Sequence, residues 1–358
     1  MRKWHLIWWI AVLSTTASFA QKFVYQAGVH SFFNNNEFTN CNVKTSQTMA
    51  GVHFAPQLGL SFEEKHLIFA GLDVLHEFGS DQVIGDIHPV AYYQLNGKPF
   101  VFYMGAFPRK PLLDNYPRMF FQDSINNYRP VINGLFWEYR SNKDDHINAW
   151  LDWTGRQTHE RKEAFFMGWS GRFNSGIFYG QHFGYMFHYA SRMDPPIPEP
   201  VHDNGLILTS IGIDLAKKVN FEKMEINAGW AIGLERDRGS DDGWHKPQGF
   251  ASEIKVEYRG IGLFNTLYTG DKRQVFFDRY QTGLYWGDQA YRASKYDRAD
   301  FYICFIKNPV VHVKFIYTLH FLEQRMFHEQ SLYATFDLDN LPKKKQKEYR
   351  YLWSNWFK

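Results

Sequence analysis

The pair of residues closest to a hydrolytic arrangement is a serine and a histidine on adjacent predicted strands. Ser170 belongs to a segment near 161–173, and His182 belongs to the next segment, near 176–191. A serine nucleophile needs a base within hydrogen-bond reach and a third group that orients the base. Pairing the strands about their short turn displaces His182 by three residues, and no carboxylate or amide is clearly in third position. The sequence therefore predicts no catalytic residue, and we expect the protein not to be an enzyme.

Metal binding is equally unsupported by spacing. Asp237, Asp241 and Asp242 form a loose acidic loop that does not match the EF-hand pattern. His182 and His188 share a strand face, but six residues of strand separate them by roughly 20 Å. We expect no metal and no cofactor.

Composition excludes several other classes of protein. The chain of 358 residues has 40 Lys+Arg and 37 Asp+Glu, a net charge of +3, which gives no basic excess for binding nucleic acid. Its two cysteines, Cys41 and Cys304, exclude a disulfide scaffold. Aromatic residues are unusually frequent, at 18% of the chain.

The first twenty residues have the features of an export signal. A basic start at Arg2-Lys3 precedes a short apolar run and a small-x-small site that ends at Ala20. We expect cleavage after Ala20, so that the mature protein leaves the cytoplasm with 38 basic residues (40 − 2) against 37 acidic ones.

The rest of the chain follows a period of two residues. In Lys223–Glu235, apolar residues such as Met224, Ile226 and Trp230 fall on one parity, and polar or small residues fall on the other. Side chains of a strand alternate between its two faces. Sixteen such segments are predicted between residues 23 and 339, many of them long enough for a tilted strand that spans a bilayer.

The connections between these segments alternate in length. Those after even-numbered segments are short, such as the hairpin signal Asn96-Gly97, whereas most after odd-numbered segments are long, such as 109–129 and 271–299. Short turns at one end and long loops at the other are typical of an outer-membrane barrel.

With its leader and aromatic-rich strands, the chain resembles a Gram-negative outer-membrane porin-type β-barrel of the Bacteroides group. The resemblance covers 21–339 and is architectural, so it transfers no functional residue. It implies an all-β, up-and-down antiparallel transmembrane barrel of about 16 strands (14–18). Lipid-facing side chains and aromatic belts at the membrane surfaces would explain the surplus of aromatic residues, and a polar lumen would explain a mean hydropathy of −0.44. A soluble β-sandwich or propeller is the alternative. We assign 1–20 to a cleaved signal peptide, 21–339 to the barrel and 340–358 to a basic aromatic periplasmic tail.

Two sets of charged residues are candidates for lining a pore. In general porins the third long loop folds inward, and the loop 109–129 is third here. The constriction candidates are Arg109, Arg118, Asp123 and Arg129. The lumen-lining candidates, of mixed sign, are Lys223, Glu225, Glu253, Lys255, Glu257 and Arg259. An outward loop and structural salt bridges are the alternatives.

The loop 271–299 combines aromatic and acidic residues that suit sugar stacking. The ligand candidates are Tyr280, Tyr285, Trp286 and Asp288. A loop that packs on itself as a lid is the alternative.

These features predict an outer-membrane channel for passive diffusion of small hydrophilic solutes, possibly carbohydrate, with membrane lipid as the other partner. One alternative is a plugged barrel whose long loops bind a glycan or a protein. A second is an outer-membrane lipid hydrolase, because barrel phospholipases and lipid A deacylases place a serine and a histidine on the outer wall.

Overall fold

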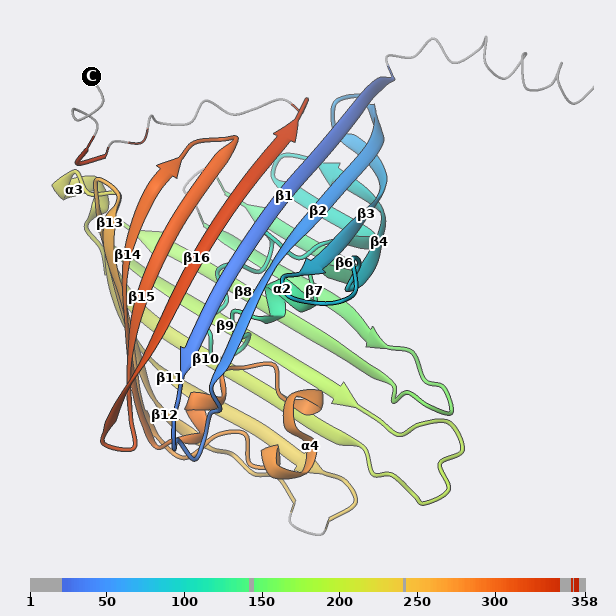
Figure 1. The fold of residues 1–358 in the computed structure, drawn as a ribbon, viewed down its shortest axis with the longest axis vertical. Coiled ribbons are helices and arrows are strands. Elements are labelled where there is room, and N and C mark those ends of the chain that lie inside the picture. The colour runs from blue at the N-terminus through green and yellow to red at the C-terminus, as the bar shows by residue number, and fades with distance from the viewer. Residues whose placement is uncertain (1–20, 142–144, 241–242, 342–348, 350, 354–358) are drawn as a thin grey trace, which may run out of the picture.

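Within the described part of the chain, the backbone forms sixteen antiparallel strands that close into one barrel (Figure 1). The computed structural model describes residues 21–141, 145–240, 243–341, 349 and 351–353. The expected signal peptide lies outside these residues. The strands are β1 (Lys22–Glu37), β2 (Gln47–Phe62), β3 (His66–Glu77), β4 (Asp86–Asn96), β5 (Phe100–Pro108), β6 (Val131–Arg140), β7 (His146–Gly155), β8 (Ala164–Ser175), β9 (Phe178–Tyr189), β10 (His202–Asp214), β11 (Lys223–Asp237), β12 (Gln248–Tyr258), β13 (Ile261–Gly270), β14 (Lys295–Lys307), β15 (Val311–Leu322) and β16 (Arg325–Asp339). The predicted fold class is confirmed.

The barrel closes through the first and last strands. β1 pairs with β16 from Gln26↔Asp339 to Glu37↔His328 and with β2 along its other edge. Because every strand has two neighbours, the backbone groups are paired internally and no edge is exposed. Within the described residues, no helix is long and apolar enough to cross a bilayer.

Alternation of residue type sets which side chains face outward. On β1, Phe23, Val29 and Phe33 are exposed on the outer face, whereas Phe32 and Asn34 are buried in the lumen. The predicted boundaries hold to within a few residues for most strands. The largest difference at a strand start is at β14, which begins at Lys295 and not near residue 300. Its first residues carry charged side chains on both parities, which hides the alternation from the sequence.

The two ends of the barrel differ. In Figure 1 the start of β1, the end of β16 and the short helix α3 (Ala216–Val219) lie at one end, and α4 (Phe277–Leu284) lies at the other. We call these the short-turn end and the long-loop end. At the short-turn end, the Tyr349 hydroxyl donates to Glu257 and the Tyr351 hydroxyl donates to the Lys307 carbonyl. The rest of the predicted tail, beyond Leu341, lies largely outside the described residues.

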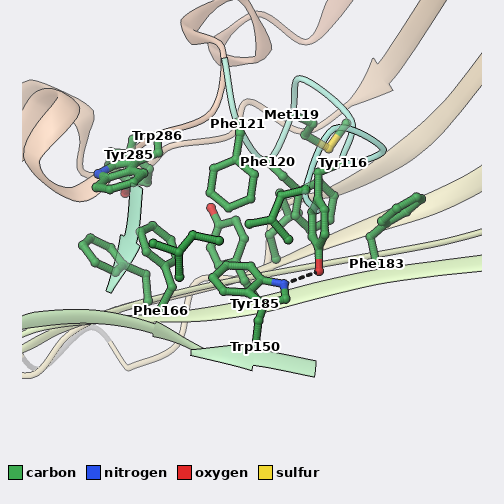
Figure 2. Close-up of a cluster of buried hydrophobic side chains, with 14 of the residues drawn as sticks. Tyr116, Met119, Phe120, Phe121, Trp150, Phe166, Phe183, Tyr185, Tyr285 and Trp286 are labelled. Atoms are coloured by element: carbon green, nitrogen blue, oxygen red, sulfur yellow. Dashed lines mark hydrogen bonds between the residues drawn. The ribbon is translucent and has the colours of Figure 1, made fainter. Parts of the chain in front are cut away.

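One long connection enters the lumen between β5 and β6. We call residues 109–130 the first insertion; it contains the short helix α2 (Ile125–Tyr128). Its Phe120 and Phe121 are buried against inward residues of β7 to β9, and the Trp150 indole donates a 2.8 Å hydrogen bond to the Tyr116 hydroxyl (Figure 2). Aromatic packing therefore fixes this insertion on the wall.

A second connection packs on the first. Residues 271–294, the second insertion, contain α4 and the 3-10 turn η1 (Gln289–Arg292). The Gln122 N–H donates to the Trp286 carbonyl at 2.8 Å, and the Asp288 N–H donates to the Arg118 carbonyl at 2.9 Å. The Trp286 ring lies 4.8 Å from Phe166 of β8, centroid to centroid. The two insertions are thus joined by backbone hydrogen bonds, and Trp286 of the second reaches the inner wall at β8.

We predict that Phe120→Ala loosens the first insertion. Phe120 is fully buried against Tyr116, Phe183 and Tyr185, so its removal should cost about 3–5 kcal/mol. The expected result is faster proteolysis within residues 109–130 and a lower unfolding midpoint in urea. Phe78→Ala, at an exposed loop position, is the matched control and should change neither. Equal protease resistance of both variants would show that other contacts hold the insertion.

Candidate functional site

A cavity of about 380 Å³ lies between the two insertions and the wall formed by β1, β2, β14 and β16. Its lining is mostly polar and includes several side-chain amides. These amides belong to Asn34, Asn36, Gln47, Gln122, Asn127 and Gln289. Amides donate and accept hydrogen bonds, so the lining suits a ligand rich in hydroxyl groups.

An ionic cluster forms the side of the cavity at β14. The Arg298 guanidinium is almost fully buried and lies 2.7 Å from Asp300, 3.4 Å from Asp123 and 3.6 Å from Glu329. Arg118 of the first insertion adds contacts of 2.8 Å to Asp123 and 3.0 Å to Asp300. The cluster therefore ties the wall to the insertion.

The loop between β1 and β2 joins this cluster through Lys44. The Lys44 ammonium donates to both carboxylate oxygens of Asp288, at 3.0 and 3.1 Å. Asp288 also accepts from the Ala290 N–H at the start of η1. Burial by itself would raise the pKa of Asp288, but the charges of Lys44 and Arg298 and the Ala290 N–H hold it below its ordinary value. Asp288 is therefore ionised at neutral pH and fixes the second insertion against this loop.

A hydrogen-bonded chain runs from the cavity into the wall. Asn34 Nδ2 donates to Glu329 Oε1 at 2.6 Å, and Glu329 Oε2 lies 2.9 Å from His320 Nε2. His320 Nδ1 lies 2.8 Å from the Tyr296 hydroxyl. Glu329 lines the cavity, and His320 lies fully buried behind it. This order places a carboxylate next to the cavity with a buried imidazole as its hydrogen-bond partner.

The formal charges of the cluster do not balance. Four carboxylates, those of Asp123, Asp288, Asp300 and Glu329, share three cations, those of Lys44, Arg118 and Arg298. One negative charge is left over among these ion-paired groups. The ion-paired groups on this side of the cavity therefore carry a net negative charge.

The four predicted constriction residues do not lie together in the structure. Asp123 and Arg129 line the cavity, and Arg118 lies behind it in the ionic cluster. Arg109 is buried away from the cavity, in an ion pair with Asp152 of β7. The first insertion thus brings two of the four to one site.

The predicted lumen-lining residues are not among those that line the cavity, and they lie between the middle of the barrel and its short-turn end. Five of them form inward ion pairs in the described structure: Lys223 with Glu257, Lys255 with Glu253, and Glu225 with Arg172. Arg259 lies in the turn after β12, with φ of +50°.

The four predicted ligand residues of the second insertion also lie apart from one another in the structure. Asp288 and Trp286 line the cavity, but the Trp286 side chain is largely covered by Phe121, Phe166 and arginine side chains. The Tyr285 hydroxyl bonds Glu235 inside the packing, and the Tyr280 hydroxyl donates to Asp237 at 3.0 Å. Packing contacts therefore occupy most of these aromatic residues.

Ser170 and His182 do not form a pair. The register sets Gly171 opposite His182, so Ser170 faces the lumen and His182 faces outward. His182 instead accepts from the Trp169 indole at 2.9 Å and lies 2.8 Å from the Thr209 hydroxyl. Alternation of side chains separates the serine from the histidine, which excludes a dyad between them.

Sequence reasoning missed Asn34, Lys44, Arg298, His320 and Glu329. Four of them lie on strands, where a polar inward residue looks like any other lumen residue. The run Asn34-Asn35-Asn36 was the available signal, because three amides in one strand near its long-loop end are unusual there. In the described residues, no group of three or more His, Cys, Asp or Glu is arranged to hold a metal ion.

Comparison with solved structures supports the fold. A loop L8 deletion mutant of OmpT, an outer membrane protein of Vibrio cholerae, is 8% identical, with a TM-score of 0.51, and the match covers 89% of this chain and 100% of that one. An anion-selective porin from Comamonas acidovorans is 9% identical with a TM-score of 0.49, and covers 89% and 99%. The likeness to the OmpT mutant shows a shared barrel fold and, at this identity, nothing about function. No curated protein matches the chain.

Comparison with protein families changes the functional conclusion. A family model described as Lipid A 3'-O-deacylase-type matches residues 16–345. The expectation of a diffusion channel and the expectation of a protein without enzymatic activity are therefore wrong, and the lipid-hydrolase alternative agrees better with this match. Strand periodicity revealed the barrel, but it carries no information on the chemistry inside it. The chain is an outer-membrane β-barrel that belongs to the lipid A 3′-O-deacylase-type family of hydrolases.

Proposed function

We propose that this protein hydrolyses an acyl ester of lipid A in the outer leaflet of the outer membrane. Family membership over most of the chain is the observation that carries the proposal. Long loops of outer-membrane barrels face the cell exterior, where this glycolipid lies. The cavity is bordered by the β1–β2 loop and by both insertions, and its amide-rich lining suits the sugar headgroup.

In the proposed mechanism, Glu329 is the general base. Its carboxylate takes a proton from a water molecule, and the water oxygen attacks the acyl carbonyl carbon. The tetrahedral intermediate then collapses, the bond between the carbonyl carbon and the sugar oxygen breaks, and the proton passes to that oxygen. The products are a free fatty acid and a sugar hydroxyl.

Three neighbours support this role of Glu329. Asn34 and His320 hold its two oxygens in place. The Lys44 ammonium has three N–H donors, and two of them bind Asp288. The third donor can bind the developing oxyanion.

We predict that Glu329→Gln abolishes most of the activity while the barrel still folds. An amide keeps the shape of the side chain but cannot accept the proton, and loss of a general base costs about 10²–10⁴-fold in rate. The measurement is mass spectrometry of lipid A after incubation with the refolded protein, with heat-modifiable gel mobility as the test of folding.

Ser170→Ala is the matched control for this experiment. Ser170 is buried on β8 and is not among the residues that line the cavity, so this variant should keep wild-type activity. Full activity of Glu329→Gln, or loss of activity in Ser170→Ala alone, would contradict the mechanism. A folded wild-type protein that releases no fatty acid would contradict the proposed function.

A further prediction concerns the Lys44–Asp288 contact that shapes the cavity. Because its pKa in the folded protein lies below the ordinary value, Asp288 stabilises the fold fully above that value, about 3.9, and loses this effect as the pH falls below it. We expect Asp288→Asn to lower the free energy of unfolding by about 1–3 kcal/mol at pH 7. The difference from wild type should shrink below about pH 4, as measured by urea unfolding at a series of pH values. A difference that is constant from pH 7 to pH 3 would show that charge is not its cause.

A further inference from the structure

Arg129 differs from the other cations of the cavity. Lys44 and Arg298 are bound to carboxylates, whereas Arg129 has no ion-pair partner among the residues that the structure describes. Its side chain is exposed although it lines the cavity. A guanidinium with five N–H donors therefore faces the cavity without a protein anion to satisfy it.

The surroundings of Arg129 hold it in position. Its guanidinium carbon lies 5.7 Å from the centroid of the Trp286 ring, in a cation–π contact. Its carbonyl accepts a 2.8 Å hydrogen bond from Arg109 Nε, and Arg109 is anchored in turn by the buried Asp152. A guanidinium that rests on an indole and starts from a fixed backbone loses little conformational freedom when it binds an anion.

The charges around the cavity are also arranged asymmetrically. The cluster around Glu329 has one surplus negative charge, which repels an anionic group from that side. Arg129 comes from the first insertion, at the end of α2, and Trp286 supports it from the second. An anionic headgroup would therefore be oriented with its negative group at Arg129 and its ester toward Glu329.

We propose that Arg129 binds a phosphate group carried on the sugar of the glycolipid substrate. This inference rests on the proposed function and names the chemical feature by which the site selects its substrate. The planar guanidinium can give two parallel hydrogen bonds to phosphate oxygens, which a neutral amide lining cannot provide. The amides would contact sugar hydroxyls, and Arg129 would distinguish phosphorylated from unphosphorylated headgroups.

The test compares bisphosphorylated lipid A with the same lipid after enzymatic removal of its phosphates, both in detergent micelles. For wild type, the KM for deacylation should be lower with the phosphorylated lipid. Arg129→Ala should raise that KM about tenfold or more, with kcat little changed, and should not change the KM for the dephosphorylated lipid. Arg129→Lys should recover part of the loss, because it keeps the charge without the bidentate geometry. Arg156→Ala removes an exposed positive charge from a loop outside the cavity lining and should behave as wild type.

Two outcomes would overturn the inference. An equal effect of Arg129→Ala on both lipids would mean that Arg129 has a structural role only, and no effect on either would mean that it does not contact the headgroup. Inorganic phosphate is a separate arm: inhibition at millimolar concentrations that equals the effect of the lipid phosphate would show an unspecific anion site and would also count against the inference.

Failure of the proposed function gives a different result. If wild type releases no fatty acid, binding of the two lipids can be measured directly by quenching of tryptophan fluorescence. Tighter binding of the phosphorylated lipid that depends on Arg129 would then support the inference even though hydrolysis is absent. Equal binding of both lipids would overturn it.

Discussion

The pairing of β1 with β16 is the interaction on which the barrel and its candidate site both depend. It closes the sheet, and without it two strand edges would be left with unpaired backbone groups in the membrane. The same pairing brings Asn34 next to Glu329, which are 295 residues apart in the chain. Because β15 follows in the same ladder, His320 comes to lie behind Glu329. The site therefore forms only when the barrel closes, because its residues come from strands at opposite ends of the chain.

The two insertions fill part of the barrel lumen and border the candidate site. Aromatic residues of the first insertion pack on the inward faces of β7 to β9. The second insertion is joined to the first by backbone hydrogen bonds. What remains is a cavity on the opposite wall, between these loops and β1, β2, β14 and β16. The high aromatic content thus serves two purposes, the outer face in lipid and the packing of loops in the lumen. From composition alone, we attributed it to the membrane face only.

Most of the fold could be predicted from the sequence, because side-chain alternation and loop lengths are local properties. The strands from Lys223 to Asp237 and from His66 to Glu77 are examples in which the pattern and the structure nearly coincide. The site could not be predicted in the same way. Glu329 and Arg298 belong to different strands, and their contact depends on barrel register and on the tilt of long side chains. Asp123 and Trp286 were singled out as loop residues, but their common position beside one cavity depends on how two loops fold inward.

The pairing of charges explains why a porin-like barrel is a poor guide to function here. In a diffusion channel, charges along the lumen act on passing solutes through water, so they must remain accessible. In this lumen most of the charges that surround the cavity are held in ion pairs with one another, including Arg298 with three carboxylates within 3.6 Å. Such pairs cost desolvation energy and contribute little to selectivity, but they hold a carboxylate and its partners in a fixed geometry. Hydrolysis of a bond requires fixed positions of the reacting groups, whereas diffusion does not. The internal charge network therefore agrees with a hydrolase better than with the diffusion channel that the barrel shape suggests.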